Sequence, residues 1–435
     1  MQMTASDIAQ ITGGVLHGPD TTCDGASIDT RTIAAGALFV PIVDVRDGHD
    51  FVPIALAAGC GAYLTMREPA GGTAIVVADT SAALTALGKE ARRRHRGTVI
   101  GITGSVGKTS VKDLALAAIG HTRKTHASER SFNNELGVPL TLLNAPGDTE
   151  VLIVEMGARG IGHIAELCDI ATPDIGIVTY VGAVHTSEFG TIEAVAQAKG
   201  ELIAALPESG RAILNADSSP VLAMKATSPA PVITYGVGGD LAAVDITVDS
   251  ELHPTFHLVS YGRVYQVTLP VHGVHQVSNA LAALAAAEAV GVAPSQAIEG
   301  LAHASLSPWR MELGRSPAGA VVINDAYNAN AISTEAALRS LAAIDATQRV
   351  AVLGVMAELG DRHDQDHLAM AELCRDLGIR LIAFQEPAYG PAPLDDLDAV
   401  IDALGSLTAT DAILIKGSRV AGLEALATRL LEPVA

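Results

Sequence analysis

Short apolar runs separated by amphipathic stretches recur along most of this 435-residue chain. An apolar run at 98–102 leads into a glycine-rich turn, after which a helical pattern begins near Lys108. Further apolar runs follow at 151–155 and 175–179, again with helical patterns between them. Strands that alternate with helices predict a mainly parallel sheet with right-handed crossovers.

Residues 241–272 follow a different pattern. Short segments such as 256–260 and 264–269 alternate apolar and polar residues. Because this period of two is typical of half-buried strands, we expect antiparallel strands at one edge of the sheet. An alanine-rich helix at about 277–290 ends the region.

The two ends of the chain carry α/β patterns of their own. The first 96 residues contain helical patterns at 6–11 and 51–58 and a strand-like run at 73–77. After Ser307-Pro308 the alternation restarts, with a helix from about Thr334 and strand-like runs at 320–324, 350–353, 381–384 and 412–415. We therefore predict an α/β protein of three domains, 1–96, 97–304 and 305–435.

The composition limits the classes of function. The formal charge is −20, from 28 Lys and Arg against 48 Asp and Glu, which argues against general nucleic-acid binding. Hydrophobic residues make up 49% of the chain, enough for packed cores and against disorder. A basic cluster at 92–96 is either a phosphate-binding patch or, as we favour, a helix end that complements its own dipole.

The four cysteines give no sign of a structural metal or a disulfide framework. They lie far apart, without a CxxC pair, at Cys23, Cys60, Cys168 and Cys374. This spacing fits a reducing compartment. Because neither a signal peptide nor an apolar run of about 18 residues is present, we expect a cytoplasmic protein without membrane insertion.

The strongest motif is the run 101–109, which reads GITGSVGKT. A strand that enters a glycine-rich turn and then a helix directs backbone N–H groups at an anion. Lys108 would supply charge to the β- and γ-phosphates, and the Thr109 hydroxyl would join a Mg²⁺ shell. Ile102 stands where the strict phosphate-loop pattern has glycine, and the alternative is a merely structural turn. The residues expected to hold the nucleotide phosphates are Gly104, Ser105, Gly107, Lys108, Thr109 and Ser110.

Glu155 ends the apolar run VLIVE, at the edge of the sheet where α/β proteins place their sites. Its carboxylate could cap a neighbouring helix. Next to a nucleotide loop, a hard oxygen ligand for Mg²⁺ is the better interpretation.

These motifs and others are similar to those of the Mur ligase superfamily, and in particular of its MurF family. The segments that carry the resemblance, in the family's order, are SIDTR (27–31), DGHDF (47–51), TGSVGKTS (103–110), SFNNELGVPLTLL (131–143), EMGARGIGHI (155–164), VGAVH (181–185), AKGEL (198–202), HQVSNALAA (275–283), RME (310–312), DAYNAN (325–330), MAELG (356–360) and KGSR (416–419). The resemblance implies a small N-terminal uridine-binding domain, a central ATPase domain and a C-terminal Rossmann-like domain that closes over the site.

The resemblance also implies roles for residues that the pattern alone leaves open. It makes His185, otherwise a structural histidine, a second metal ligand, and Lys199, otherwise a surface lysine, a carbamylated ligand of Mg²⁺. It makes Asn279, otherwise a helix cap, a reader of adenine. Arg310 would reach the γ-phosphate from across the cleft, and Asp325 would contact the ribose or another ligand.

Two sets of residues would then bind the substrates, although several of them could equally be turn or cap residues. The set facing the uridine nucleotide and the central substrate loop is Ser27, Asp29, Arg31, Asp47, Gly48, His49, Asn133, Asn134 and Glu135. The set in the third domain is Tyr327, Asn328, Asn330, Lys416, Ser418 and Arg419.

The implied reaction joins D-alanyl-D-alanine to UDP-N-acetylmuramoyl-tripeptide with ATP, Mg²⁺ (two ions) and an acyl-phosphate intermediate, in a monomeric enzyme. Departures from the family pattern occur at 40–46, Trp309, Ala331 and Val355, and none of them removes a phosphate or metal group. One alternative is a ligase of a specialised pathway with another acid or amine. The other is a nucleotide-binding regulator with a degenerate site.

Overall fold

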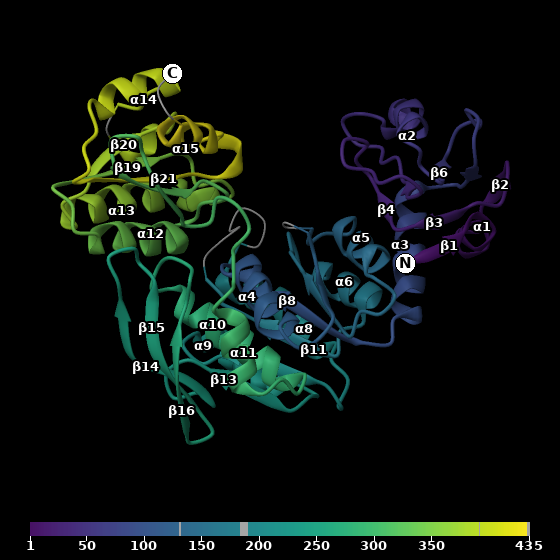
Figure 1. Ribbon diagram of the computed structural model, residues 1–435, viewed down its shortest axis with the longest axis horizontal. Coiled ribbons are helices and arrows are strands. Elements are labelled where there is room, and N and C mark those ends of the chain that lie inside the picture. The colour runs from purple at the N-terminus through teal and green to yellow at the C-terminus, as the bar shows by residue number, and fades with distance from the viewer. Residues whose placement is uncertain (130–131, 183–189, 391, 433–435) are drawn as a thin grey trace.

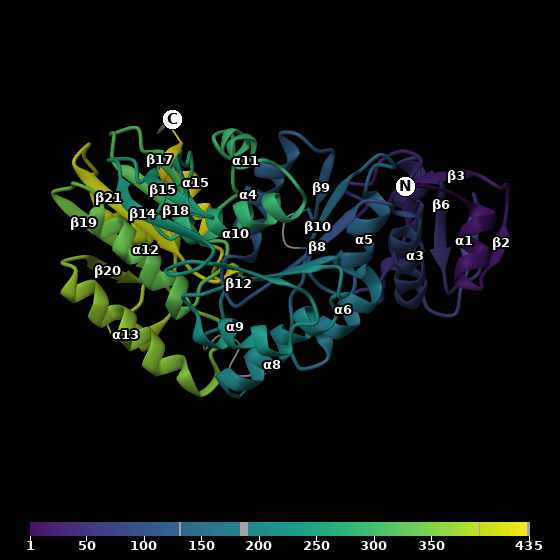
Figure 2. The ribbon, with the colours of Figure 1, turned by 90° about the horizontal axis from the view of Figure 1, so that it is seen from below.

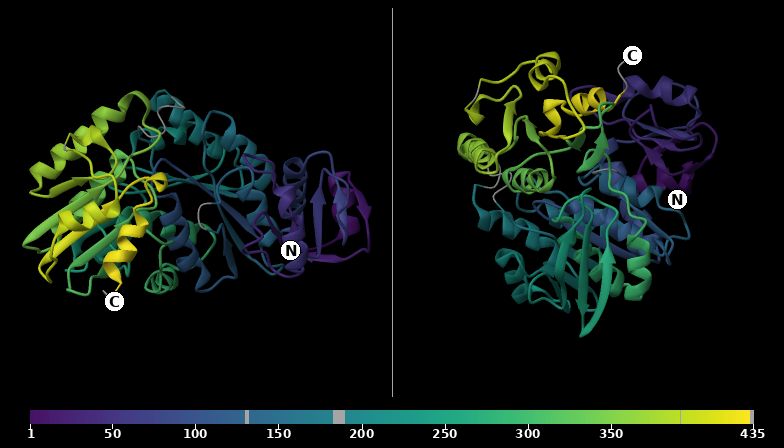
Figure 3. Two further views of the ribbon diagram at one scale, coloured as in Figure 1. Left: turned by 90° about the horizontal axis from the view of Figure 1, so that it is seen from above. Right: turned by 60° about the vertical axis from the view of Figure 1, so that its left-hand side comes forward.

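The computed structural model describes residues 1–129, 132–182, 190–390 and 392–432. Three sheet-containing parts follow one another along an elongated molecule, with the N-terminal part at one end and the C-terminal part at the other (Figure 1). Figure 2 and Figure 3 show the same order from other sides. The predicted α/β class is confirmed.

The N-terminal part is built on a five-stranded sheet in the order β2-β7-β6-β5-β4. Its strands are β2 (Val15–His17), β7 (Ala74–Val76), β6 (Ala62–Thr65), β5 (Leu38–Phe39) and β4 (Ala26–Ser27). A short antiparallel pair, β1 (Gln2–Thr4) and β3 (Thr22–Asp24), lies beside it. The helices are α1 (Ala5–Thr12), α2 (Val52–Ala57) and α3 (Thr80–Arg94). The predicted helices and strand of this part are therefore present.

The central part contains a nine-stranded sheet in the order β16-β15-β14-β13-β12-β11-β8-β10-β9. Strands β9 (Thr125–Ala127), β10 (Val151–Glu155), β8 (Thr98–Thr103), β11 (Ile175–Val178), β12 (Arg211–Asn215), β13 (Val232–Tyr235) and β14 (Leu241–Val248) are parallel. Strands β15 (Pro254–Ser260) and β16 (Arg263–Thr268) extend β14 as an antiparallel edge. Both the parallel sheet and its antiparallel edge were predicted from the residue pattern.

The helices of the central part cover this sheet. They are α4 (Lys108–Gly120), α5 (Gly137–Asn144), α6 (His163–Ala171), α8 (Ile192–Ala204), α9 (Ser219–Ala223), α10 (Gln276–Ala289) and α11 (Pro294–Leu301). Helices α4 and α10 pack against each other, and the alanines of α10 are almost all buried. Small side chains allow this close helix contact, which holds the start of α4 at the carboxyl edge of the sheet.

The C-terminal part has a five-stranded sheet in the order β17-β18-β21-β19-β20, parallel except for β17. Its strands are β17 (Glu312–Arg315), β18 (Val321–Asp325), β21 (Asp411–Lys416), β19 (Gln348–Leu353) and β20 (Arg380–Ala383). Its helices are α12 (Ala331–Ala343), α13 (His363–Asp376), α14 (Leu397–Leu404) and α15 (Glu424–Leu431).

Helix α12 begins three residues before the predicted start near Thr334. The side chain of Asn330 accepts a hydrogen bond from Ser333 N, and the Ser333 hydroxyl receives the Asn330 N–H in return. This reciprocal cap satisfies N–H groups at the start of the helix, which explains why the helix extends to Ala331.

The basic cluster at 92–96 lies at the end of α3, as the preferred interpretation predicted. Arg92 donates to the carbonyls of Ala171 and Thr172 and pairs with Asp174, while Arg93 and Arg94 pair with Glu90. These contacts within the protein account for most of the cluster's charge.

Helix α3 joins the N-terminal and central parts into one apolar core. Leu87 is fully buried in a cluster that also contains Leu64 of β6 and Leu152 of β10. A Cβ added to Gly88 would lie 2.8 Å from Pro139 Cα, which shows how closely α3 approaches α5. The apolar packing is therefore continuous across the boundary that we propose near residue 96.

We predict that Leu87→Ala lowers the free energy of unfolding by about 2–5 kcal/mol, because it opens a cavity in this shared core. Ile54→Ala, on α2 with 52% of Ile54 exposed, is the control, and we expect a change of about 0.5 kcal/mol or less from it. Chemical denaturation followed by circular dichroism measures both. Equal stability of the two variants would contradict a shared core.

Candidate active site

The phosphate loop lies between β8 and the first turn of α4. Gly107 has φ +82°, a left-handed conformation that favours glycine, and it directly precedes the helix. A Cβ added there would lie 2.6 Å from Asn279 Oδ1, and one on Gly104 would overlap Thr179 Oγ1. Glycine is thus required at both positions, and the N–H groups that begin α4 are directed at the cavity.

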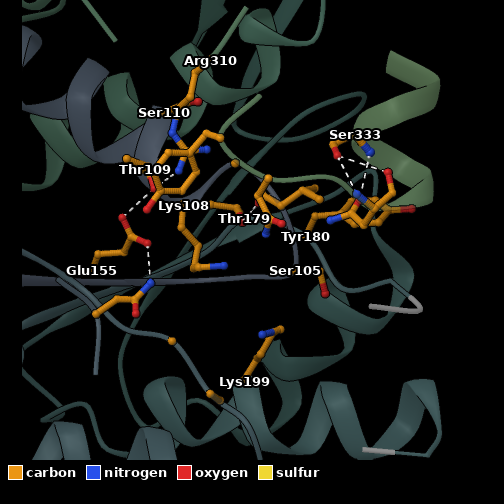
Figure 4. A pocket seen from close by; sticks show the side chains of 18 of the residues that line it. Ser105, Lys108, Thr109, Ser110, Glu155, Thr179, Tyr180, Lys199, Arg310 and Ser333 are labelled. Atoms are coloured by element: carbon orange, nitrogen blue, oxygen red, sulfur yellow. Dashed lines mark hydrogen bonds between the residues drawn. The ribbon is translucent and has the colours of Figure 1, made fainter. Parts of the chain in front are cut away.

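The Thr109 hydroxyl connects the loop to two distant segments. It donates to Glu155 Oε2 over 2.8 Å, and Arg310 Nη2 donates to Thr109 Oγ1 over 2.8 Å. Glu155 is 1% exposed, and its other carboxylate oxygen accepts from Asn133 Nδ2 over 2.9 Å. Figure 4 shows these side chains converging below Arg310.

Arg310 is held over the loop by its neighbours. Its guanidinium lies 4.2 Å from the centre of the Tyr327 ring, a cation–π geometry. The flanking residues Trp309 and Met311 have φ +62° and +52°, conformations that are uncommon for these side chains. Arg310 Nε is buried, and no described residue accepts its hydrogen bond. Such an unpaired donor in the cavity favours an anionic ligand.

Two buried lysines lie in the same cavity. Lys108 Nζ donates to Gly104 O over 2.8 Å, and burial lowers the pKa of Lys108 while the charge of Glu155 opposes the shift. Lys199, 2% exposed, points from α8 into the cavity (Figure 4). Burial, and then the charge of Lys108, lowers the pKa of Lys199 to about 7. Its amine is therefore uncharged in a large fraction of molecules near neutral pH.

A cavity of about 920 Å³ joins these groups with residues from every part of the chain. The predicted residues that line it are Ser105, Gly107, Lys108, Thr109, Ser110, Asn133, Asn134, Glu135, Glu155, Lys199, Asn279, Arg310, Asp325, Tyr327, Asn328, Asn330 and Lys416. This volume and mixed lining are typical of a small-molecule site.

Several third-domain residues are bound to one another within the protein. Lys416 is buried and pairs with Asp325, and it also donates to Asn328 O over 3.0 Å. Asn330 caps α12. Ser418 and Arg419 do not line the cavity: the Ser418 hydroxyl accepts from Ala357 N, and Arg419 stacks on the Trp309 ring at 4.1 Å.

The predicted uridine-side residues are also outside the cavity, although Ile28 among them lines it. Asp47 accepts from the backbone and ring of His49, whose Nε2 accepts from Met66 N. A Cβ added to Gly48 would lie 2.6 Å from the backbone of Ile42. Ser27, Asp29 and Arg31 form a local turn closed by an Asp29–Arg31 ion pair. Predicted residue His185 lies outside the described residues.

Three cavity residues were not singled out in the sequence. Thr179, just after β11, donates to Val106 O over 2.6 Å and so supports the loop. Asn215, the last residue of β12, donates to Thr179 O over 2.7 Å. Their position at strand ends was the available signal. Glu358 belongs to MAELG, which was noted only as part of the resemblance.

The oxygen donors around Thr109 fit Mg²⁺. A buried carboxylate and a hydroxyl lie 2.8 Å apart beside a loop that directs N–H groups at phosphate. Hard oxygen donors next to phosphates are the set that Mg²⁺ prefers. Asn279 is placed against the loop by its contact with Gly107, and its Nδ2 donates to Gln276 Oε1 over 2.8 Å, so it is in the body of α10 and not at its cap.

Comparison with known proteins assigns the class. Residues 102–287 match the Mur ligase middle domain, and residues 309–419 match the Mur ligase glutamate ligase domain. This fold and this site are those of a Mur ligase.

Relatives along the whole chain narrow the assignment. The chain is 37% identical to the UDP-N-acetylmuramoyl-tripeptide–D-alanyl-D-alanine ligase of Mycobacterium tuberculosis (99% of this chain, 98% of the relative). It is 33% identical to the protein of that name from Escherichia coli (99% of each). The crystal structure of MurF from Acinetobacter baumannii matches with a TM-score of 0.85 at 28% identity (100% and 99% covered). The chain belongs to the MurF family, as its motifs predicted.

We predict that Arg310→Ala lowers the rate of ATP-dependent phosphate release by about 100-fold or more, because the guanidinium acts on charge in the transition state. Nucleotide affinity, measured by calorimetry, should change much less. Arg315→Ala removes the same charge from a surface ion pair with Glu251 on β17 and is the control. Arg310→Ala turning over at the wild-type rate would contradict the role given to Arg310.

Proposed function

We propose that this protein ligates D-alanyl-D-alanine to UDP-N-acetylmuramoyl-tripeptide with ATP, in the synthesis of peptidoglycan precursors. The observation that carries this proposal is the convergence of Lys108, Thr109, Glu155 and Arg310 in one cavity. The names of the full-length relatives and the crystal structure of Thermotoga maritima MurF with ADP (27% identity, TM-score 0.82, 93% of this chain and 96% of that chain) support it.

The first step transfers the γ-phosphoryl group to the substrate carboxylate. The loop N–H groups and Lys108 hold the phosphates, and the Arg310 guanidinium turns from Thr109 to the transferring group. Positioned positive charge stabilises the charge that spreads over the phosphoryl oxygens. The carboxylate oxygen forms a bond to phosphorus, and ADP leaves.

Mg²⁺ would be held by Glu155 and Thr109, with a second ion near Lys199 and His185. When bound, Mg²⁺ neutralises phosphate charge and orients the reacting oxygens. Lys199 joins this set if its amine takes up CO₂, because the carbamate is an anionic oxygen ligand. Its burial and lowered pKa support that modification.

The second step forms the amide. The free amine of the dipeptide attacks the acyl carbon, and phosphate leaves. Acyl phosphates hydrolyse readily, so water must be excluded. The third domain, which contributes Arg310, Tyr327 and Asn328 to the cavity, would supply this cover and bind the dipeptide.

The other substrate would enter from the opposite side. Ile28, Asn133, Asn134 and Glu135 line the cavity between the N-terminal and central parts. They lie where the peptide of the UDP-linked substrate would cross from a uridine site at Ser27–Arg31 and Asp47–His49. Because one chain supplies every part of the lining, we propose that a monomer is sufficient for catalysis.

The precursor and ATP place this reaction in the cytoplasm, as we propose. Within the described residues, no helix combines the length and apolar character needed to cross a bilayer.

We predict that ADP and phosphate appear only when both UDP-MurNAc-tripeptide and D-alanyl-D-alanine are present with ATP and Mg²⁺. Mass spectrometry should show the pentapeptide product, and Lys108→Ala should lower its formation by about 100-fold or more. Turnover with a different acid or amine alone would favour a specialised ligase. ATP binding without turnover of any pair would favour a nucleotide-binding regulator.

We predict that ¹³C-bicarbonate gives a carbamate carbonyl NMR signal in the wild type and in Lys225→Gln, an exposed control, but not in Lys199→Gln. The sign with pH follows from the pKa of about 7. Below it the ammonium form predominates and cannot take up CO₂, so the signal should weaken as the pH falls through 7. A signal that persists in Lys199→Gln would contradict the assignment.

A further inference from the structure

The second step places a demand on the cavity that the residues above do not meet. At neutral pH a dipeptide amine is mostly an ammonium ion, since α-amino groups have a pKa of about 8. The groups that surround the transferred phosphoryl group, Lys108 and Arg310, are cations, and Lys199 lies beside them. An ammonium entering there is repelled unless a carboxylate receives it.

Two of the carboxylates among the described lining residues already have strong partners. Glu155 accepts from Thr109 and Asn133. Asp325 accepts from Lys416 and from Met311 N. Both are therefore engaged in holding the site together.

Two others lie on the wrong side. Glu135 directly precedes α5, and Glu166 is on α6. Both helices pack on α3, toward the N-terminal part and away from the third domain (Figure 1). They face the end of the cavity that we assign to the UDP-linked substrate.

Glu358 is on the third domain and faces the phosphate loop. It lines the cavity, and its side chain is exposed to the solvent there. Its charge acts on Lys108, whose pKa is lowered by burial and raised in part by Glu155 and Glu358. A carboxylate at this place lies beside the phosphoryl group that Lys108 would hold.

The backbone aims this carboxylate. Glu358 has φ +67°, a left-handed conformation in which non-glycine residues often mark functional sites. The two residues before it are fixed: Met356 N donates to His367 Nε2 over 2.9 Å, and Ala357 N donates to Ser418 Oγ over 2.9 Å. Ser418, which sequence similarity placed at the substrate, thus acts here on the Glu358 loop.

His367 explains the rigidity of this loop. It is fully buried on α13, and its Nδ1 lies 2.6 Å from His363 O, so that Nε2 is left as the acceptor for Met356 N. His363, His367 and Glu386 lie close enough to resemble a metal site. The engagement of Nε2 by a backbone N–H favours a structural brace instead.

We propose that Glu358 receives the ammonium group of the incoming amine and presents its nitrogen to the acyl phosphate. The carboxylate takes one proton from the ammonium, and the freed lone pair forms the C–N bond. The C–O bond to the phosphoryl group breaks with its electron pair on phosphate, which takes the second proton from nitrogen. This inference rests on the proposed ligase reaction.

Hydroxylamine provides the test, since it is an uncharged nucleophile at neutral pH and traps an acyl phosphate as a hydroxamate. We expect Glu358→Gln to lower dipeptide ligation by about 10- to 100-fold, the effect of losing a charge-assisted hydrogen bond. Hydroxamate formation, measured with ATP, Mg²⁺ and the UDP-linked substrate without dipeptide, should stay near the wild-type rate and also reports that the variant is folded.

Asp361→Asn is the matched control, because it removes an exposed carboxylate three residues away that does not line the cavity. It should leave both reactions unchanged. Glu358→Asp keeps the charge and should recover part of the ligation. Loss of both reactions in Glu358→Gln, or of neither, overturns the role of Glu358. Wild-type protein that forms neither product nor hydroxamate overturns the ligase proposal itself.

Discussion

The Thr109 hydroxyl is the point on which the arrangement of the site depends. It lies between the Glu155 carboxylate and the Arg310 guanidinium, 2.8 Å from each, and so joins the phosphate loop, the end of β10 and the start of the third domain. An anion at the loop would compete with Thr109 for Arg310, and a cation would compete with its proton for Glu155. Ligand binding and the position of the third domain are therefore coupled through one hydroxyl group.

The same logic explains why unfavourable features occur together here. Lys108 and Lys199 are buried, Arg310 Nε has no partner among the described residues, and Trp309, Met311 and Glu358 have left-handed backbones. Each of these features destabilises the protein in isolation. The rigid sheet edge, the α4–α10 contact and the His367 brace hold them in place. A site that receives a triphosphate, a carboxylate and an amine uses such groups directly.

Much of this structure could be predicted from the sequence, because its information is local. Apolar runs gave the main parallel strands, the period of two gave β15 and β16, and the GITGSVGKT run gave the phosphate loop. Short strands such as β9 and β12 have too few residues to produce a clear pattern. The start of α12 was missed because Asn330 looked like a loop residue and acts as a cap. The burial of Lys199, the Lys416–Asp325 pair and the role of Glu358 depend on contacts between distant segments, which periodicity does not encode.

The central claim is that Arg310 and the loop act on one triphosphate. A crystal structure of the protein with Mg²⁺ and a non-hydrolysable ATP analogue tests this most directly. The account predicts that the Arg310 guanidinium leaves Thr109 for the γ-phosphate, while Thr109 and Glu155 oxygens face the metal ion. A triphosphate bound away from Lys108, or an Arg310 that still contacts only Thr109 with the analogue in place, would contradict it.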